Sequence, residues 1–297
     1  MSFYEEISAN KRTTVLLFAV FFILLFALGY VFSFVLGDAL FIYIFGGFAV
    51  IYAAFSYFNS DKIVLAISRA REATKEEFPK FHNIAEEMSI ASGIPKPRLY
   101  VIEDTAMNAF ATGRDPKHSV ICATTGLLAK MNREELQGVI AHEMSHIKNR
   151  DILVMTMAAI LVGLAVLMSD FMLRMFLFGG LRGNRDSKGG AVMIIGIVVG
   201  LLLAILTPLI AQLINLSISR KREYLADASG VQMTRYPQGL ASALRKISGD
   251  KEVLEAANKA TAHLYIANPL KGQKLWFKSL FSTHPPIEDR IKKLEAM

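Results

Sequence analysis

The chain has 297 residues, of which 53% are hydrophobic, and its mean hydropathy is +0.37. A soluble globular protein has about 45–50% apolar residues, so the excess predicts segments that face lipid. The single cysteine, Cys122, excludes an internal disulfide framework, and burial as a small apolar side chain is its expected role. The net charge of +7 is typical of a membrane protein with large cytoplasmic parts, and no nucleic-acid-binding module accompanies it. We therefore expect an integral membrane protein that binds a lipid bilayer and no nucleic acid.

Two uncharged apolar stretches lie near the N-terminus, at residues 15–36 and 40–58. Each is long enough to cross about 30 Å of hydrocarbon as a helix. Because they are nearly contiguous, residues 1–58 are predicted to form a transmembrane hairpin. The first stretch is too long for the apolar core of a signal peptide and lacks a convincing cleavage site, which indicates an uncleaved anchor.

The first large polar region covers residues 59–151. An amphipathic helix is predicted at about 78–92, and strands are predicted at 99–103, 107–112 and 118–124, with turn signals between them. This part of the chain is therefore expected to be α+β with a small sheet.

The next predicted helix carries the motif His142-Glu143-x-x-His146. Asn132 and Glu135 have the spacing of a capping box, which predicts the start of this helix. Two histidines four positions apart lie on one helical face and can bind one metal ion, whereas Glu143 points about 100° away and can hold a water. This geometry predicts a zinc peptidase with one Zn²⁺ per chain, in which Glu143 takes the water proton and returns it to the leaving amine.

Two further apolar stretches follow, at residues 152–168 and 191–218. The later one is long enough to span a bilayer and contains Pro208, which predicts a kink. The earlier one is short for a span, and a buried core helix is its alternative. A glycine-rich turn separates the two stretches, so residues 152–218 are predicted to form a second transmembrane pair, which brings the total to four spans.

The distribution of positive charge predicts the orientation of the chain. If all four stretches cross the membrane, the N-terminus, residues 59–151 and residues 219–297 lie on one side. Four of the 33 Lys and Arg residues fall in the opposite loop, 169–190, and many of the others flank the spans closely. The positive-inside rule then places both polar regions in the cytoplasm.

A catalytic zinc usually takes three protein ligands, so a third must come from elsewhere in the chain. Glu223 and Asp227 lie four positions apart on one face of a predicted helix. His146 precedes the third stretch by six residues and Glu223 follows the fourth by five, so both would emerge about 8–9 Å from the same membrane face. Glu223 is the predicted third ligand, and Asp227 is predicted to accept a hydrogen bond from a ligand histidine. Alternatively, the two carboxylates only pair with Arg222 or Lys221 on a solvated face.

Taken together, these motifs resemble those of the HtpX-type membrane zinc metalloproteases. The resemblance covers essentially the whole chain and rests on residues 142–151, 108–113, 223–227, 283–286 and 289–291. It implies a gluzincin catalytic domain with its active site facing the cytoplasm from the bacterial inner membrane. It also implies degradation of damaged or misfolded membrane proteins as part of a stress response. The implied zinc ligands are His142, His146 and Glu223, with Glu143 catalytic.

The resemblance also implies that residues 108–112 are an edge strand on which an extended peptide docks. An unpaired edge offers main-chain hydrogen bonds that tolerate many sequences. Asn108 is expected to present its amide to the substrate backbone, or else to be a turn residue. His284 is expected to act as an oxyanion donor or near the zinc, and Arg290 to pair with Asp227 or another acid. The predicted substrate-binding residues are Asn108, Ala109, Phe110, Ala111 and Thr112.

Two other functions are compatible with parts of this pattern. A CaaX prenyl-protein endopeptidase would share the zinc motif, but that family has about three more spans than this chain. A membrane scaffold or chaperone with a degenerate metal site would have lost a ligand or the base, whereas all of them are intact here. We therefore expect polypeptide substrates, and the sequence makes no prediction of the oligomeric state.

Overall fold

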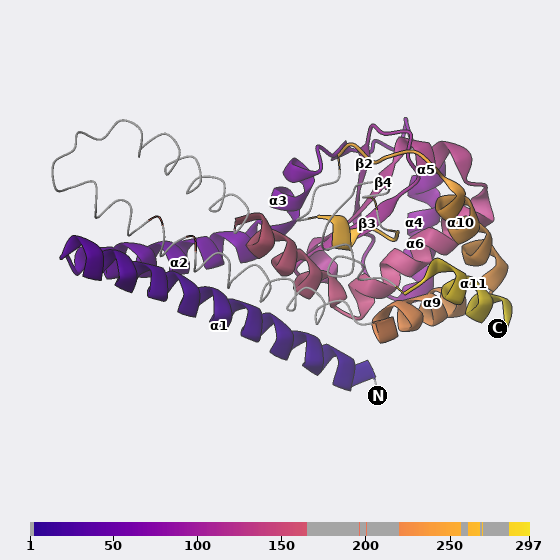
Figure 1. Ribbon diagram of the computed structural model, residues 1–297. Coiled ribbons are helices and arrows are strands. Elements are labelled where there is room, and N and C mark those ends of the chain that lie inside the picture. The colour runs from indigo at the N-terminus through magenta and orange to yellow at the C-terminus, as the bar shows by residue number, and fades with distance from the viewer. Residues whose placement is uncertain are drawn as a thin grey trace.

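The computed structural model describes residues 3–164, 220–256, 261–267 and 285–297, together with positions 196, 200 and 269. Within these residues the chain is mainly helical, with one small mixed sheet, as the sequence predicted (Figure 1). The fourth apolar stretch (apart from those two isolated positions), the end of the third and His284 lie outside the described residues.

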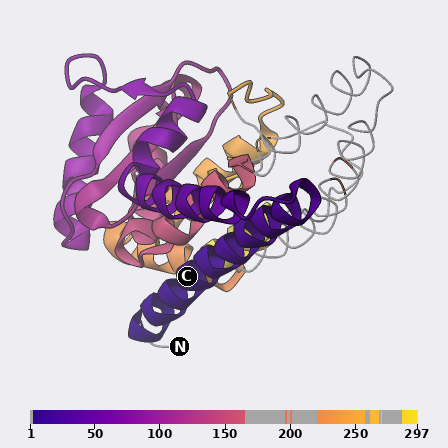
Figure 2. The same cartoon turned by 90° about the vertical axis from the view of Figure 1, so that its left-hand side faces the viewer.

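The N-terminal hairpin consists of α1 (Phe3–Leu36) and α2 (Leu40–Phe58), which lie side by side (Figures 1 and 2). A tight turn joins them at Gly37, whose φ of 74° is readily adopted by glycine. The segments Arg12–Phe34 and Leu40–Phe58 are long and apolar enough to cross a membrane. The helix α1 starts well before the predicted span, so its first turns extend beyond the apolar segment and reach the rest of the protein.

The apolar side chains of this hairpin are largely exposed. Ile23, Phe34, Tyr43 and Ile51 are each at least 70% exposed. Soluble proteins rarely leave so large an apolar surface uncovered. This surface is suited to lipid.

The four strands form a sheet in the order β1-β2-β4-β3. The short β1 (Arg71–Glu72) pairs antiparallel with β2 (Arg98–Ile102), which is parallel to β4 (Ser119–Thr124). The strand β3 (Ala109–Gly113) is antiparallel to β4 and forms an edge of the sheet. The three predicted strands are confirmed to within two residues at each end, and β1 was not predicted.

One helix occupies the centre of the catalytic part. It is α6 (Arg133–Lys148), and nearly all of its residues after Glu134 are buried. The predicted capping box is confirmed, because Asn132 and Glu135 exchange side-chain to backbone hydrogen bonds of 2.8 and 2.9 Å. Both histidines of the zinc motif therefore lie on a helix that is fixed at its start and enclosed along its length.

Other helices enclose α6. The predicted helix at 78–92 is α4 (Pro79–Ser92), and α9 (Arg220–Thr234) runs beside α6. The helices α10 (Pro237–Gly249) and α11 (Ile287–Glu295) complete the C-terminal part (Figure 1). Two short helices that the sequence did not predict are α3 (Ser60–Ile67) and α5 (Thr125–Lys130).

A helix at Asp151–Leu164 follows α6 almost directly. Arg150 makes the connection with a φ of 60°, a conformation that non-glycine residues rarely adopt. This helix packs into a cluster that also contains Phe110 and the buried Cys122. Its described residues are covered on most sides by protein, and whether the stretch 152–168 crosses the bilayer stays a prediction.

Candidate metal centre

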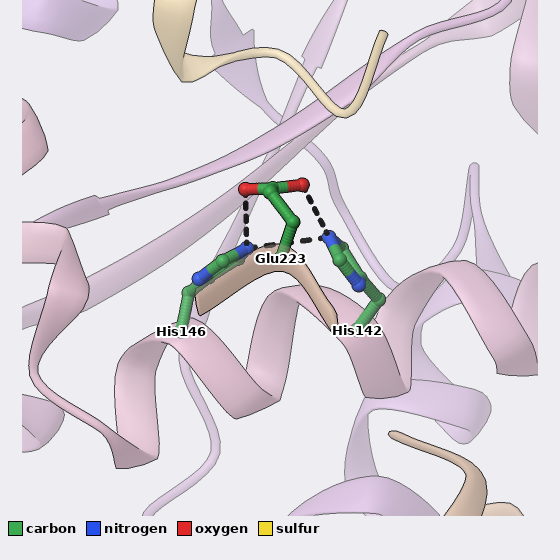
Figure 3. A group of neighbouring side chains, drawn as sticks. All are labelled: His142, His146 and Glu223. Atoms are coloured by element: carbon green, nitrogen blue, oxygen red, sulfur yellow. Dashed lines mark hydrogen bonds and ion pairs between the residues drawn. The ribbon is translucent and has the colours of Figure 1, made fainter. Parts of the chain in front are cut away.

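The helix α6 presents His142 and His146 to the same point (Figure 3). Their Nε2 atoms lie 3.2 Å apart, and each residue is at most 4% exposed. The four-residue spacing brings the two rings to one face of the helix, as the sequence predicted.

The helix α9 brings Glu223 to this pair. Its Oε2 atom lies 3.8 Å from His142 Nε2, and its Oε1 atom lies 3.6 Å from His146 Nε2. The close approach of the helices depends on Gly230, where an added Cβ would lie 3.2 Å from the backbone nitrogen of His142. Glu223 therefore faces both histidines although it is far from them in the sequence (Figure 3).

These three residues fit a zinc ion in chemistry and in distance. Nitrogen from neutral histidine and oxygen from glutamate are ordinary zinc ligands, and bonds of about 2.0–2.1 Å in tetrahedral geometry separate the ligand atoms by roughly 3.3 Å. All the candidate ligand atoms of the group lie within 4.8 Å of one another. A site with two histidines and one glutamate leaves a fourth position for water or substrate.

The outer nitrogen of His142 faces a buried ion pair. His142 Nδ1 lies 3.0 Å from Asp227 Oδ1, and Arg290 donates to both oxygens of Asp227, at 2.7 and 2.9 Å. Arg290 Nη1 also lies 3.4 Å from Glu223 Oε2. Burial, together with the charge of Arg290, lowers the pKa of His142 to about 4, so its imidazole is neutral at pH 7 and able to bind a metal.

The outer nitrogen of His146 faces a different acid, Asp151. His146 Nδ1 lies 3.0 Å from Asp151 Oδ2. Burial lowers the pKa of His146, but the carboxylates of Asp151, Glu223 and Glu143 raise it further, to about 9. This part of the site therefore favours a positive charge, which a bound zinc ion would supply.

Asp151 was not singled out by the sequence reasoning. The signal that could have found it is an acidic residue just beyond the end of the motif helix and directly before an apolar stretch. An acid in that place is suited to orient a ligand histidine.

Glu143 lies beside the histidine pair and is 2% exposed. Burial raises the pKa of its carboxyl to about 7, although a hydrogen bond from the Ala111 backbone opposes the shift. A carboxyl group with a pKa near neutrality can both accept and release a proton, as a general base and acid must. Glu143 is thus placed between α6 and the strand β3.

The predicted substrate-binding residues form β3 and the position before it. Their outward backbone groups have partners in this structure. The Ala109 carbonyl accepts a hydrogen bond of 2.9 Å from Ile266 N, and Gly113 N lies 3.4 Å from Thr156 Oγ1. The Asn108 amide donates to the Ala267 carbonyl at 3.0 Å. Segment 261–267 therefore lies along part of this edge.

The fold and the site define a class of protein, a zinc metallopeptidase with two histidine ligands and one glutamate ligand. A model of peptidase family M48 matches residues 75–297, which is most of the chain. The chain belongs to peptidase family M48.

Its relatives include several proteins named "Protease HtpX homolog". The one from Dictyoglomus thermophilum is 50% identical over 304 residues, covering 100% of this chain and 95% of that protein. The one from Thermoanaerobacter pseudethanolicus is 51% identical over 251 residues, covering 84% of this chain and 82% of the relative. The one from Streptococcus agalactiae is 46% identical over 296 residues and covers 99% of each chain. The resemblance to HtpX-type zinc proteases is confirmed, and with it the expectation of a membrane protein.

A solved structure has a similar fold. The crystal structure of S. mikatae Ste24p matches with a TM-score of 0.52 and 19% sequence identity, covering 94% of this chain and 63% of that chain. This chain thus spans less than two thirds of the length of the solved chain. At this identity the similarity concerns the fold alone.

Proposed function

We propose that this zinc metallopeptidase is an endopeptidase that degrades misfolded or damaged membrane proteins at the cytoplasmic face of a bacterial inner membrane. The observation that carries the proposal is the direct attachment of the metal centre to apolar helices. The zinc-binding helix α6 continues through Arg150 into the helix Asp151–Leu164, and α1 contacts Asp151 beside His146. A site mounted in this way lies close to lipid, where membrane polypeptides are within reach.

The chemistry assigned to the chain's own residues is proton transfer. A bound zinc ion would polarise the scissile carbonyl and make a water molecule more acidic. Glu143 holds that water, accepts its proton during attack and passes the proton to the departing nitrogen. The buried position of Glu143 suits both steps, because its pKa is raised to about 7.

Peptide substrates are proposed to dock on β3. In its antiparallel pairing with β4, the Asn108 carbonyl accepts from Thr124 N, so the alternate residues Ala109 and Ala111 direct their backbone groups away from β4. Ala111 lies next to Glu143, which would place the scissile bond of a docked strand near the base. Binding at Ala109 would displace its hydrogen bond with Ile266.

The role of the base is tested with the full chain in detergent. Glu143→Gln is expected to retain one zinc per chain and to lose at least about 100-fold in the rate of cleavage of an unfolded membrane protein. Glu134→Gln, at an exposed position of the same helix, is the control and should cleave normally. Normal cleavage by Glu143→Gln would overturn the assignment of the base. Cleavage confined to prenylated C-terminal peptides would overturn the proposed substrate class.

The orientation is tested by labelling in intact cells. In a Cys122→Ser background, a cysteine at the exposed Lys117 should be protected from a membrane-impermeant reagent. A cysteine at Gly183, in the predicted opposite loop, should be labelled. The reverse pattern would place the active site on the outer side of the membrane.

A further inference from the structure

The first membrane helix carries a buried polar residue close to the metal centre. Asn10 is 2% exposed and lies two residues before the apolar segment Arg12–Phe34 of α1. Its Nδ2 atom donates to Asp151 Oδ1 at 2.7 Å and to the Asn149 carbonyl at 3.2 Å. These bonds join the start of α1 to the short connection that follows α6.

The second oxygen of the same carboxylate faces a zinc ligand. Asp151 Oδ2 lies 3.0 Å from His146 Nδ1, so Asp151 is held on one oxygen by Asn10 and on the other by the histidine. A carboxylate with both oxygens engaged has little freedom to rotate. Its orientation fixes the ring of His146, and the ring in turn fixes the direction in which Nε2 points.

Helix docking alone does not account for an asparagine at this position. The Oδ1 atom of Asn10 is buried and has no hydrogen-bond partner among the described residues. A buried polar atom without a partner costs stability, whereas an apolar side chain of similar size would pack without that cost. The benefit of the amide must therefore lie in the two bonds that its nitrogen makes.

The connection that Asn10 holds also needs support. Arg150, between Asn149 and Asp151, has a left-handed φ of 60°, which costs conformational energy in a non-glycine residue. Asn10 contacts the residues on both sides of it. The amide thus fixes the strained turn on which the position of Asp151 depends.

We propose that Asn10 is a positioning residue for the zinc centre, and that it acts on the ligand His146 through Asp151. The first membrane helix is then part of the support of the metal site as well as an anchor. The inference rests on the metal site and is independent of which polypeptides are cleaved.

The first experiment measures zinc binding directly. The full chain in detergent is titrated with a competing chelator, and Co²⁺ substituted for zinc reports the ligand geometry by its absorption spectrum. Asn10→Leu is expected to weaken zinc binding about 3- to 10-fold, somewhat less than the 10- to 100-fold typical of a direct neighbour of a ligand, and to shift the Co²⁺ spectrum. The zinc-free variant should melt within a few degrees of the zinc-free parent.

Three further variants separate this role from packing. Thr14→Val is the matched control, because the Thr14 hydroxyl bonds to the Asn10 carbonyl within α1 and removing it should leave zinc binding unchanged. Asn10→Ala removes the same donor without adding apolar bulk and should weaken zinc as Asn10→Leu does, so the test does not depend on one variant folding. Asn10→Gln retains a donor and should recover part of the loss. Parental affinity and spectrum in both the Leu and Ala variants would overturn the proposal.

A double-mutant cycle tests the route through Asp151. In an Asp151→Ala background, Asn10→Leu should change zinc affinity by less than about twofold, because its target is already absent. If the two substitutions instead multiply their losses, Asn10 acts on the site by another route and the proposal fails. Both readouts are metal binding, so they stand even if the proposed substrate class is wrong.

Discussion

The two histidines of the metal centre lie one turn apart on α6, yet different parts of the molecule support them. His142 rests on Asp227, which Arg290 holds with two hydrogen bonds. His146 rests on Asp151, which the neutral amide of Asn10 holds from the first membrane helix. Each histidine has a carboxylate behind it, and each carboxylate has a donor behind it, but one donor is charged and the other is not.

This difference shows where the site is rigid and where it can respond. The His142 side lies entirely within the catalytic part and includes an ion pair with a completely buried arginine. The His146 side includes a contact between elements 141 residues apart that meet near the membrane border. Changes on the first side should therefore affect the stability of the fold, and changes on the second should mainly affect metal binding.

The largest effect is expected from Arg290→Met. Removing one partner of a buried ion pair leaves the other charge without compensation, which typically costs about 3–5 kcal/mol. Asp227 would be that charge, and its pKa, which is raised by burial but lowered more by Arg290 and His142, would rise. The measurement is urea unfolding of the zinc-free chain. Lys292→Met, on the exposed face of the same helix, should unfold as the parent does, and equal stability of the two variants would contradict this prediction.

A smaller effect, expressed in a different property, is expected from Asp151→Ala. Loss of the acceptor behind a metal-binding histidine should weaken zinc binding about 10- to 100-fold. Chelator competition measures it. Asp104→Ala removes a comparably buried carboxylate that accepts from the Ala106 and Glu255 backbones, away from the metal, and should leave zinc affinity unchanged. A larger loss of zinc affinity in the control than in Asp151→Ala would refute the distinction between the two sides.

Gly230→Ala tests the packing that brings Glu223 to His142. The added methyl would lie 3.2 to 3.5 Å from backbone atoms of Ala141 and His142, so α9 would have to move away by a few tenths of an ångström. We expect a cost of about 1–2 kcal/mol in stability, which calorimetry would measure, and zinc binding a few-fold weaker. Gly249→Ala, where nothing lies within 4 Å, is the control and should be neutral or slightly stabilising.

The smallest effect is expected from Asn132→Ala. It removes the N-cap of α6, which should cost about 1 kcal/mol in the free energy of unfolding. Because this cap lies ten residues before His142, both histidines should keep their zinc affinity. A loss of zinc affinity in this variant would show that the start of α6, and not the two carboxylates, sets the position of the ligands.

Local rules of sequence were sufficient for several elements. The capping box at Asn132, the strand that became β4 and the α2 span follow from short patterns whose physical causes are local. The depth argument that related Glu223 to His146 used only helical rise, and the structure brings their side chains to 3.6 Å. These predictions worked because each depended on periodicity or spacing along one segment.

Other features could not be read from the sequence. The alternatives for Arg290 included any acid, and its contacts with Asp227 and Glu223 depend on how α11 packs against α9. The edge strand β3 was expected to be open, yet its Ala109 carbonyl bonds to Ile266, more than 150 residues later. No local pattern encodes which distant segment will satisfy a backbone group.

By itself, the sequence determined the pair of histidines, the base between them and the apolar helices that follow, because helix geometry and hydropathy act over a few turns. The tertiary structure alone decided that Asp151 and Asn10 stand behind His146. A buried carboxylate has to find its donor in space, and the nearest one came from a helix at the other end of the chain.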